Sequence, residues 1–128
     1  MKKILVVDDS ESMRKTIRNV LASLDYLVIE AEDGDEGLEV AKKHTDLDIM
    51  LLDINMPNMN GLQLAKEFSL MMEFCRIPCI MLTTESDPEK IKIAKEIGNI
   101  KGWILKPFKA PRLIETLEKT VQKYRAKK

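Results

Sequence analysis

Short apolar runs alternate along the chain with longer stretches in which apolar residues recur at helical spacing. Runs this short and this apolar leave no polar face for water, so they predict strands buried on both faces of a parallel sheet. They occupy residues 4–7, 27–29, 49–52, 80–82 and 103–105.

The stretches between the runs predict amphipathic helices with recognisable ends. Ser10 or Ser12 is placed to cap the first helix, because a serine hydroxyl accepts a hydrogen bond from a free N–H at a helix start. Pro88 and Pro111 fit the first turns of the last two helices, and Gly98 is placed to end the earlier one.

Five strand–helix repeats predict an α/β fold with a doubly wound five-stranded parallel sheet, covered by helices on both faces. The length of 128 residues suits one domain, so we expect residues 1–128 to form a single domain. Ligands of such folds bind beyond the carboxyl ends of the strands, where the strand order reverses. A functional site is therefore expected at that edge of the sheet.

Charge and composition narrow the classes of partner. The chain has 21 Lys and Arg against 21 Asp and Glu, which argues against a protein that holds nucleic acid by excess positive charge. No apolar stretch approaches the ~18 residues that cross a bilayer, and the first apolar run ends at Asp8, too early for a signal peptide. Cys75, Cys79 and His44 are too few for a disulfide framework or a zinc site. We expect a cytoplasmic protein with no membrane or nucleic-acid partner.

Polar residues follow four of the five apolar runs. The first run is followed by Asp8 and Asp9, the third by Asp53, the fourth by Thr83 and the fifth by Lys106. Because the carboxyl ends of parallel strands share one edge of a sheet, these side chains are expected to converge. Any one of them alone is as readily a helix cap or a solvated loop residue, but the four positions together favour a site.

Three converging carboxylates would repel one another and raise their own pKa values, and a divalent cation removes that conflict. Mg²⁺ suits the site, because it takes one or two carboxylates, keeps waters and shares phosphate oxygens. With Lys106 as a point charge and Thr83 as a hydroxyl donor, the site would hold a phosphoryl group. A carboxylate among these groups would then be a nucleophile that forms an acyl phosphate.

Four short motifs surround these polar residues. Val-Val-Asp-Asp-Ser fills residues 6–10, and Leu-Asp-Ile-Asn-Met-Pro fills residues 52–57, with Gly61 shortly after. Thr83 and the Lys-Pro-Phe sequence at 106–108 complete the set. In this order they resemble the receiver domain of two-component response regulators, especially the single-domain CheY-like chemotaxis type. The resemblance covers nearly the whole chain and implies the strand order 2-1-3-4-5.

The resemblance also implies a role for each acidic residue. Asp53 would accept a phosphoryl group from a histidine kinase. Asp9, Asp53 and the backbone carbonyl of Asn55 would bind Mg²⁺, with Asp8 acting through a bound water. The protein would assist its own phosphorylation and dephosphorylation without being an enzyme for a separate substrate.

The remaining implied roles concern the phosphoryl group and the response to it. Lys106 would pair with one phosphoryl oxygen, and Thr83 would hydrogen-bond another. Thr83 and Trp103 would form the switch, since Trp103 occupies the position of the family's switch aromatic. Asn55 and Glu85 would tune hydrolysis of the phosphoryl group.

Three features depart from the family pattern. Thr84 stands where the family usually has Ala or Gly, and its bulk would narrow access to Asp53. Residues 98–102 are one residue longer than the usual segment before the switch aromatic, and Trp103 lacks the hydroxyl of a tyrosine switch.

Several functional alternatives stay open. The expected partners are a chemotaxis-type histidine kinase and a downstream target such as a motor switch protein or a phosphatase, and we expect a monomer. A phosphorelay intermediate fits the same motifs. A small Mg²⁺-dependent phosphohydrolase also uses a strand-end Asp, but such enzymes usually carry a cap domain. A degenerate receiver that only binds partners is disfavoured by the complete motif set.

Overall fold

The computed structural model describes residues 1–84 and 88–125. Within these residues, five parallel strands form one sheet in the order β2-β1-β3-β4-β5, as expected. The strands are β1 (Lys2–Val7), β2 (Tyr26–Ala31), β3 (Ile49–Asp53), β4 (Cys79–Thr83) and β5 (Ile100–Leu105). The helices are α1 (Glu11–Leu21), α2 (Gly34–Lys42), α3 (Gly61–Ser69), α4 (Pro88–Glu96) and α5 (Ala110–Arg125).

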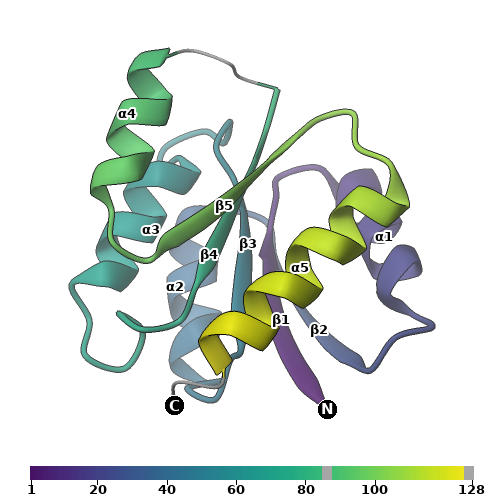
Figure 1. Ribbon diagram of the computed structural model, residues 1–128. Coiled ribbons are helices and arrows are strands. Elements are labelled where there is room, and N and C mark those ends of the chain that lie inside the picture. Colours follow the sequence, from purple (N-terminus) through teal and green to yellow (C-terminus); the bar gives the residue numbers. More distant parts are fainter. Residues whose placement is uncertain (85–87, 126–128) are drawn as a thin grey trace.

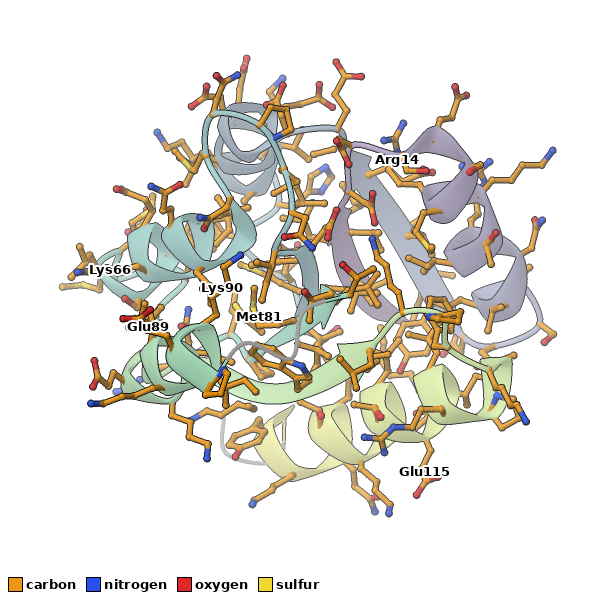
Figure 2. The ribbon with its side chains drawn as sticks, turned by 90° about the horizontal axis from the view of Figure 1, so that it is seen from above. Arg14, Lys66, Met81, Glu89, Lys90 and Glu115 are labelled. Atoms are coloured by element: carbon orange, nitrogen blue, oxygen red, sulfur yellow. The ribbon has the colours of Figure 1, made fainter. Side chains whose placement is uncertain are left out.

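Helices cover both faces of the sheet in two layers (Figure 1). Helices α1 and α5 lie on one face, where Ile17 and Leu117 belong to one apolar cluster. Helices α2, α3 and α4 lie on the other, where Leu64 and Phe68 belong to a second cluster. Seen from above, Met81 of β4 lies between the layers, whereas Lys66 and Glu115 point outward (Figure 2). The doubly wound prediction is confirmed.

Burial differs between the central and the edge strands. Strands β3 and β4 are buried along their whole length, as the apolar runs predict. The prediction is wrong for the two edge strands, because Leu27 of β2 is 41% exposed and Leu105 of β5 is 52% exposed. An edge strand has a neighbour on one side only, so side chains at the rim reach past the covering helices.

The helix boundaries follow the expected signals closely. Ser10, and not Ser12, caps α1: its hydroxyl accepts a hydrogen bond from the Met13 N–H at 3.2 Å. Pro88 is the first residue of α4 and Pro111 the second of α5. No described helix is both long and apolar enough to span a membrane.

The longer segment before Trp103 is accommodated inside β5. Strand β5 begins at Ile100, and its register with β4 pairs Cys79 with Ile100 but Ile80 with Gly102. Lys101 is therefore the extra residue of a β-bulge. Because the bulge absorbs the extra residue, Ile100 and Trp103 both pack against the cluster beneath α2, α3 and α4.

Candidate functional site

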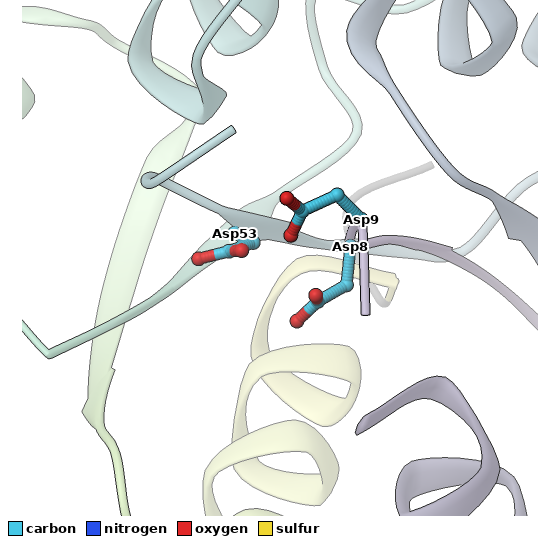
Figure 3. A group of neighbouring side chains, drawn as sticks. All are labelled: Asp8, Asp9 and Asp53. Carbon is cyan, nitrogen blue, oxygen red and sulfur yellow. The ribbon is translucent and has the colours of Figure 1, made fainter. Parts of the chain in front are cut away.

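The site lies at the carboxyl edge of the sheet, where four strands end in polar residues. Asp8 and Asp9 follow β1, Asp53 ends β3, Thr83 ends β4 and Lys106 follows β5. Parallel pairing brings these strand ends to one edge, and Figure 3 shows the three aspartates facing a common space. The predicted convergence is therefore present.

The three aspartates form a compact acidic cluster. One carboxylate oxygen from each of Asp8, Asp9 and Asp53 lies within 4.8 Å of the others. Asp8 and Asp53 are buried, at 0% and 2% exposure, whereas Asp9 is exposed. Buried carboxylates need a charge partner or hydrogen bonds, so the partners of this cluster decide its chemistry.

One ammonium group serves both buried carboxylates. Lys106 Nζ lies 3.2 Å from Asp8 Oδ2 and 3.3 Å from Asp53 Oδ1. The Ser10 N–H also donates to Asp8 Oδ1 at 2.8 Å, and the Asn55 N–H donates to Asp53 Oδ1 at 3.2 Å. Within the part of the chain that the structure describes, one positive charge faces three carboxylates, so the cluster stays negative.

The shortage of positive charge is visible in the pKa of Asp53. Burial, and then repulsion from Asp8, raise this pKa from its ordinary 3.8 to about 6, while Lys106 acts in the opposite direction. Ionisation of Asp53 is therefore less favourable than that of an ordinary aspartate, and added positive charge nearby would make it easier. A carboxylate in this condition favours a cationic or electrophilic ligand.

The donor set fits Mg²⁺. Hard divalent cations take oxygen ligands, and Mg²⁺ in particular binds through one or two carboxylates while keeping several waters. Asp9 is open to solvent, Asp53 is buried beside it, and their oxygens are close enough to share one ion. Among the described residues, the cluster contains only carboxylates and no sulfur or imidazole ligand, so it does not resemble a zinc site.

Three polar side chains border the acidic cluster on the side of β4. Thr83 is fully buried, while Thr84 and Asn55 are exposed. Asn55 Nδ2 lies 3.5 Å from Thr83 Oγ1 and 3.3 Å from Thr84 Oγ1. The hydroxyl of Thr84 therefore helps to hold the Asn55 side chain beside the phosphoacceptor candidate.

The loop after β3 depends on a glycine. A Cβ atom at Gly61 would collide with the backbone carbonyl oxygen of Asp53. The Gly61 N–H also donates to the Ile54 carbonyl at 3.2 Å, which closes the loop. Only glycine permits this close approach, and so Gly61 fixes the course of the chain that carries Asp53.

Trp103 lies away from the acidic cluster, in the middle of β5 and not at its start. It is half-buried and borders a cavity of about 270 Å³. The cavity is lined by Ile91, Ala94 and Lys95 of α4, and by Ile100, Lys101, Gly102 and Trp103 of β5. Glu85, predicted to tune hydrolysis, lies outside the described residues.

Sequence reasoning missed one residue at this site. Arg14 of α1 donates a hydrogen bond from Nη1 to the backbone carbonyl of Asp8 at 2.5 Å. The only clue in the sequence was the position of Arg14, one helical turn after the cap Ser10. This clue is weak, because charged residues in the first turn of a helix usually face solvent.

Comparison with known proteins agrees with this geometry. Residues 4–118 match the response regulator receiver domain. The chain belongs to the response regulator receiver family. Among curated relatives, chemotaxis protein CheY1 of Helicobacter pylori is 43% identical over 117 residues, which cover 91% of this chain and 94% of that protein. A CheY homolog of Campylobacter jejuni is 40% identical, with 91% of this chain and 89% of that protein covered.

Solved receiver structures are similar in fold. CheY4 of Vibrio cholerae superposes with a TM-score of 0.88 at 38% identity, covering 94% of this chain and 98% of that one. A receiver domain protein from Clostridium thermocellum has a TM-score of 0.90 at 22% identity, with full coverage of both chains, which shows the shared fold alone.

Proposed function

We propose that this chain is a chemotaxis response regulator that accepts a phosphoryl group from a histidine kinase on Asp53. The observation that carries the proposal is the Lys106 ammonium, 3.2 Å from Asp8 and 3.3 Å from Asp53 within a cluster of three aspartates. Receiver domains of the CheY type are phosphoacceptors, and the relatives named above are chemotaxis proteins.

Phosphorylation begins with attack of an Asp53 carboxylate oxygen on the phosphorus of a phosphohistidine. The new P–O bond makes an acyl phosphate, the P–N bond breaks, and the leaving imidazole nitrogen takes a proton from water. Lys106 holds one phosphoryl oxygen and the Thr83 hydroxyl donates to another, so that the charge developing on these oxygens is stabilised.

Mg²⁺ would supply the positive charge that the acidic cluster lacks, and would neutralise phosphoryl oxygens during transfer. Asp9, Asp53 and the backbone carbonyl of Asn55 would hold it, and Asp8 would act through a bound water. The arrangement of the three aspartates supports this assignment.

The switch proposal concerns Thr83 and Trp103. When Thr83 turns toward a phosphoryl group on Asp53, space opens for the indole of Trp103 to move inward. The cavity between α4 and β5 supports this, because it gives the indole room beside Ile91 and Ala94. Burial of so large a side chain changes the surface that a partner meets.

The wider proposal places residues 1–128 as a single receiver domain, monomeric and cytoplasmic. Its partners would be a chemotaxis-type histidine kinase and a target such as a motor switch protein or a phosphatase. Asn55 and Glu85 would tune hydrolysis of the phosphoryl group.

The decisive experiment is incubation with a small-molecule phosphodonor and Mg²⁺, followed by intact-mass measurement. The parent protein should gain one phosphoryl group, and Asp53→Asn or added chelator should prevent the gain. Asp46→Asn is the matched control, since Asp46 is an exposed aspartate paired with Lys3 at the opposite edge. Equal labelling of Asp53→Asn and the parent would refute the assignment.

A second experiment tests the switch through fluorescence. Trp103 is the only tryptophan, so its emission isolates the proposed movement. Emission should change on adding phosphodonor to the Mg²⁺-containing protein, and Thr83→Ala should reduce that change. If mass measurement confirms phosphorylation but emission stays constant, Trp103 is not the switch.

A further inference from the structure

Arg14 joins three parts of the molecule near the acidic cluster. Its side chain is 13% exposed and lies at the start of α1 (Figure 2). Nη1 donates to the backbone carbonyl oxygen of Asp8 at 2.5 Å, and Nε donates to Glu30 Oε1 in β2 at 3.2 Å. A guanidinium presents its donors in a rigid planar fork, so these two contacts fix its orientation.

The carbonyl that Arg14 holds belongs to the peptide group joining Asp8 to Asp9. The Asp8 carboxylate has its own partners, the Ser10 N–H at 2.8 Å and Lys106 Nζ at 3.2 Å. The Asp9 carboxylate is exposed, and no hydrogen bond or ion pair from the described residues reaches it. The position of Asp9 therefore depends on its backbone, and the peptide preceding it is held by Arg14.

Arg18 provides a natural comparison on the same helix. Its Nη1 donates to the other Glu30 oxygen, Oε2, at 2.5 Å, but within the described residues no hydrogen bond or ion pair joins Arg18 to the turn that carries Asp8 and Asp9. The two arginines thus share one carboxylate partner, and only Arg14 also touches the turn.

We propose that Arg14 is a positioning residue for the metal site: by holding the Asp8–Asp9 peptide against Glu30, it presents the Asp9 carboxylate to Mg²⁺. The inference rests on the proposed function, because that function supplies the Mg²⁺ site. The hydrogen bonds of Arg14 go to the Asp8 carbonyl and to Glu30, so it acts through the backbone of its neighbours.

Charge and positioning predict opposite signs for a neutral variant. The positive charge of Arg14 by itself repels a cation, so removing that charge would strengthen Mg²⁺ binding if charge were all that mattered. Loss of the hydrogen bond to the turn would instead weaken binding, because groups that orient metal ligands typically contribute about tenfold or more to affinity. Mg²⁺ affinity alone can therefore separate the two roles.

The test is an NMR titration of backbone amide signals with MgCl₂, without phosphodonor, on the parent and on three variants. Arg14→Gln should bind Mg²⁺ about tenfold more weakly than the parent. Arg14→Lys keeps the charge but loses the fork, and it should also bind more weakly than the parent. Arg18→Gln should bind at least as tightly as the parent. Thermal melting in chelator establishes that each variant is folded.

Each outcome decides the role of Arg14. Equal or tighter binding by Arg14→Gln overturns the inference, and so does parental affinity in Arg14→Lys. If Arg18→Gln and Arg14→Gln weaken Mg²⁺ binding equally, the effect comes from the loss of a partner for Glu30. That result also overturns the inference. If Arg14→Gln does not fold, Arg14→Lys carries the test. If the parent itself fails to bind Mg²⁺, the metal site of the proposed function is wrong and the inference falls with it.

Discussion

The two ends of the sheet use the same residue types in opposite ways. At the amino end, Lys2 Nζ pairs with Glu118 at 2.9 Å, and Lys3 Nζ pairs with Asp46 at 2.7 Å. The buried Asp48 accepts a hydrogen bond from the Lys3 N–H at 2.9 Å. Each carboxylate there has a close partner.

At the carboxyl end, the Lys106 ammonium pairs with Asp8 and Asp53, and within the described residues no ion pair reaches Asp9, the third member of the cluster. The pKa values record the difference, because the hydrogen bond from Lys3 lowers the pKa of Asp46 while burial raises that of Asp53. A matched pair stabilises the fold, whereas an undercompensated cluster lowers stability and gains an affinity for cations and phosphoryl groups. The comparison indicates that the functional site lies at the carboxyl end of the sheet, where the negative charges are not fully balanced by positive ones.

The largest effect should follow from removing the shared ammonium. Lys106→Met leaves two buried carboxylates facing each other and removes a donor to the phosphoryl group. Phosphorylation by a small phosphodonor should slow about 100-fold, the usual scale for losing one stabilising donor. The measurement is a time course of intact mass, with Lys109→Met, an exposed lysine nearby, as control. Similar phosphorylation rates for the two variants would show that Lys106 does not take part in phosphoryl transfer.

The next effect is a pH dependence of stability with an unusual sign. Asp53 has a pKa of about 6 when folded against 3.8 ordinarily, so between these values the folded state binds more protons than the unfolded state. Stability should therefore fall as pH rises through this window, by about 3 kcal/mol, since one pKa unit corresponds to about 1.4 kcal/mol.

Urea unfolding in chelator at pH 4 to 7 measures this difference, at roughly one-unit steps that span the window. The free energy of unfolding of Asp53→Asn should not fall in this way as pH rises. The difference between the parent and this variant at each pH gives the contribution of Asp53 alone, because the other titrating groups are common to both. Asp46→Asn is the control for this range: the lowered pKa of Asp46 puts its titration below 3.8, so this variant should keep the parent's fall in stability between pH 4 and 7. If the stability of the parent changed with pH in the same way as that of Asp53→Asn, Asp53 would not have a raised pKa. The proposed difference between the two ends of the sheet would then be wrong.

The smallest effect should come from the amino end. Glu118→Gln breaks the ion pair with Lys2, and both side chains are partly exposed, at 39% and 19%. The free energy of unfolding should fall by about 0.5 kcal/mol, with phosphorylation unchanged. Glu115→Gln, which breaks an exposed pair with Lys119 on the same helix, should lower the free energy of unfolding by no more than Glu118→Gln does. A phosphorylation defect in Glu118→Gln would show that the two ends are coupled.

Local physics made most of the fold predictable from the sequence. Apolar runs of strand length indicated the central strands, and Ser10 and Pro88 marked helix starts where the structure has them. The convergence of Asp8, Asp53 and Lys106 also followed, because parallel strands bring their carboxyl ends to one edge. The strand order came from the family resemblance and not from periodicity.

Other features depended on long-range contacts that no local pattern encodes. The bulge at Lys101 is defined by the pairing of β5 with β4, in which Cys79 faces Ile100 but Ile80 faces Gly102. Arg14 bonds at once to the Asp8 carbonyl and to Glu30, 16 positions along the chain, and only the tertiary structure brings these two acceptors together. The raised pKa of Asp53 arises from its burial and from repulsion by Asp8, which parallel pairing of β1 with β3 brings close to it. Sequence fixes which groups meet at the edge of the sheet, but their distances and desolvation are set by packing, because both depend on every neighbour at once.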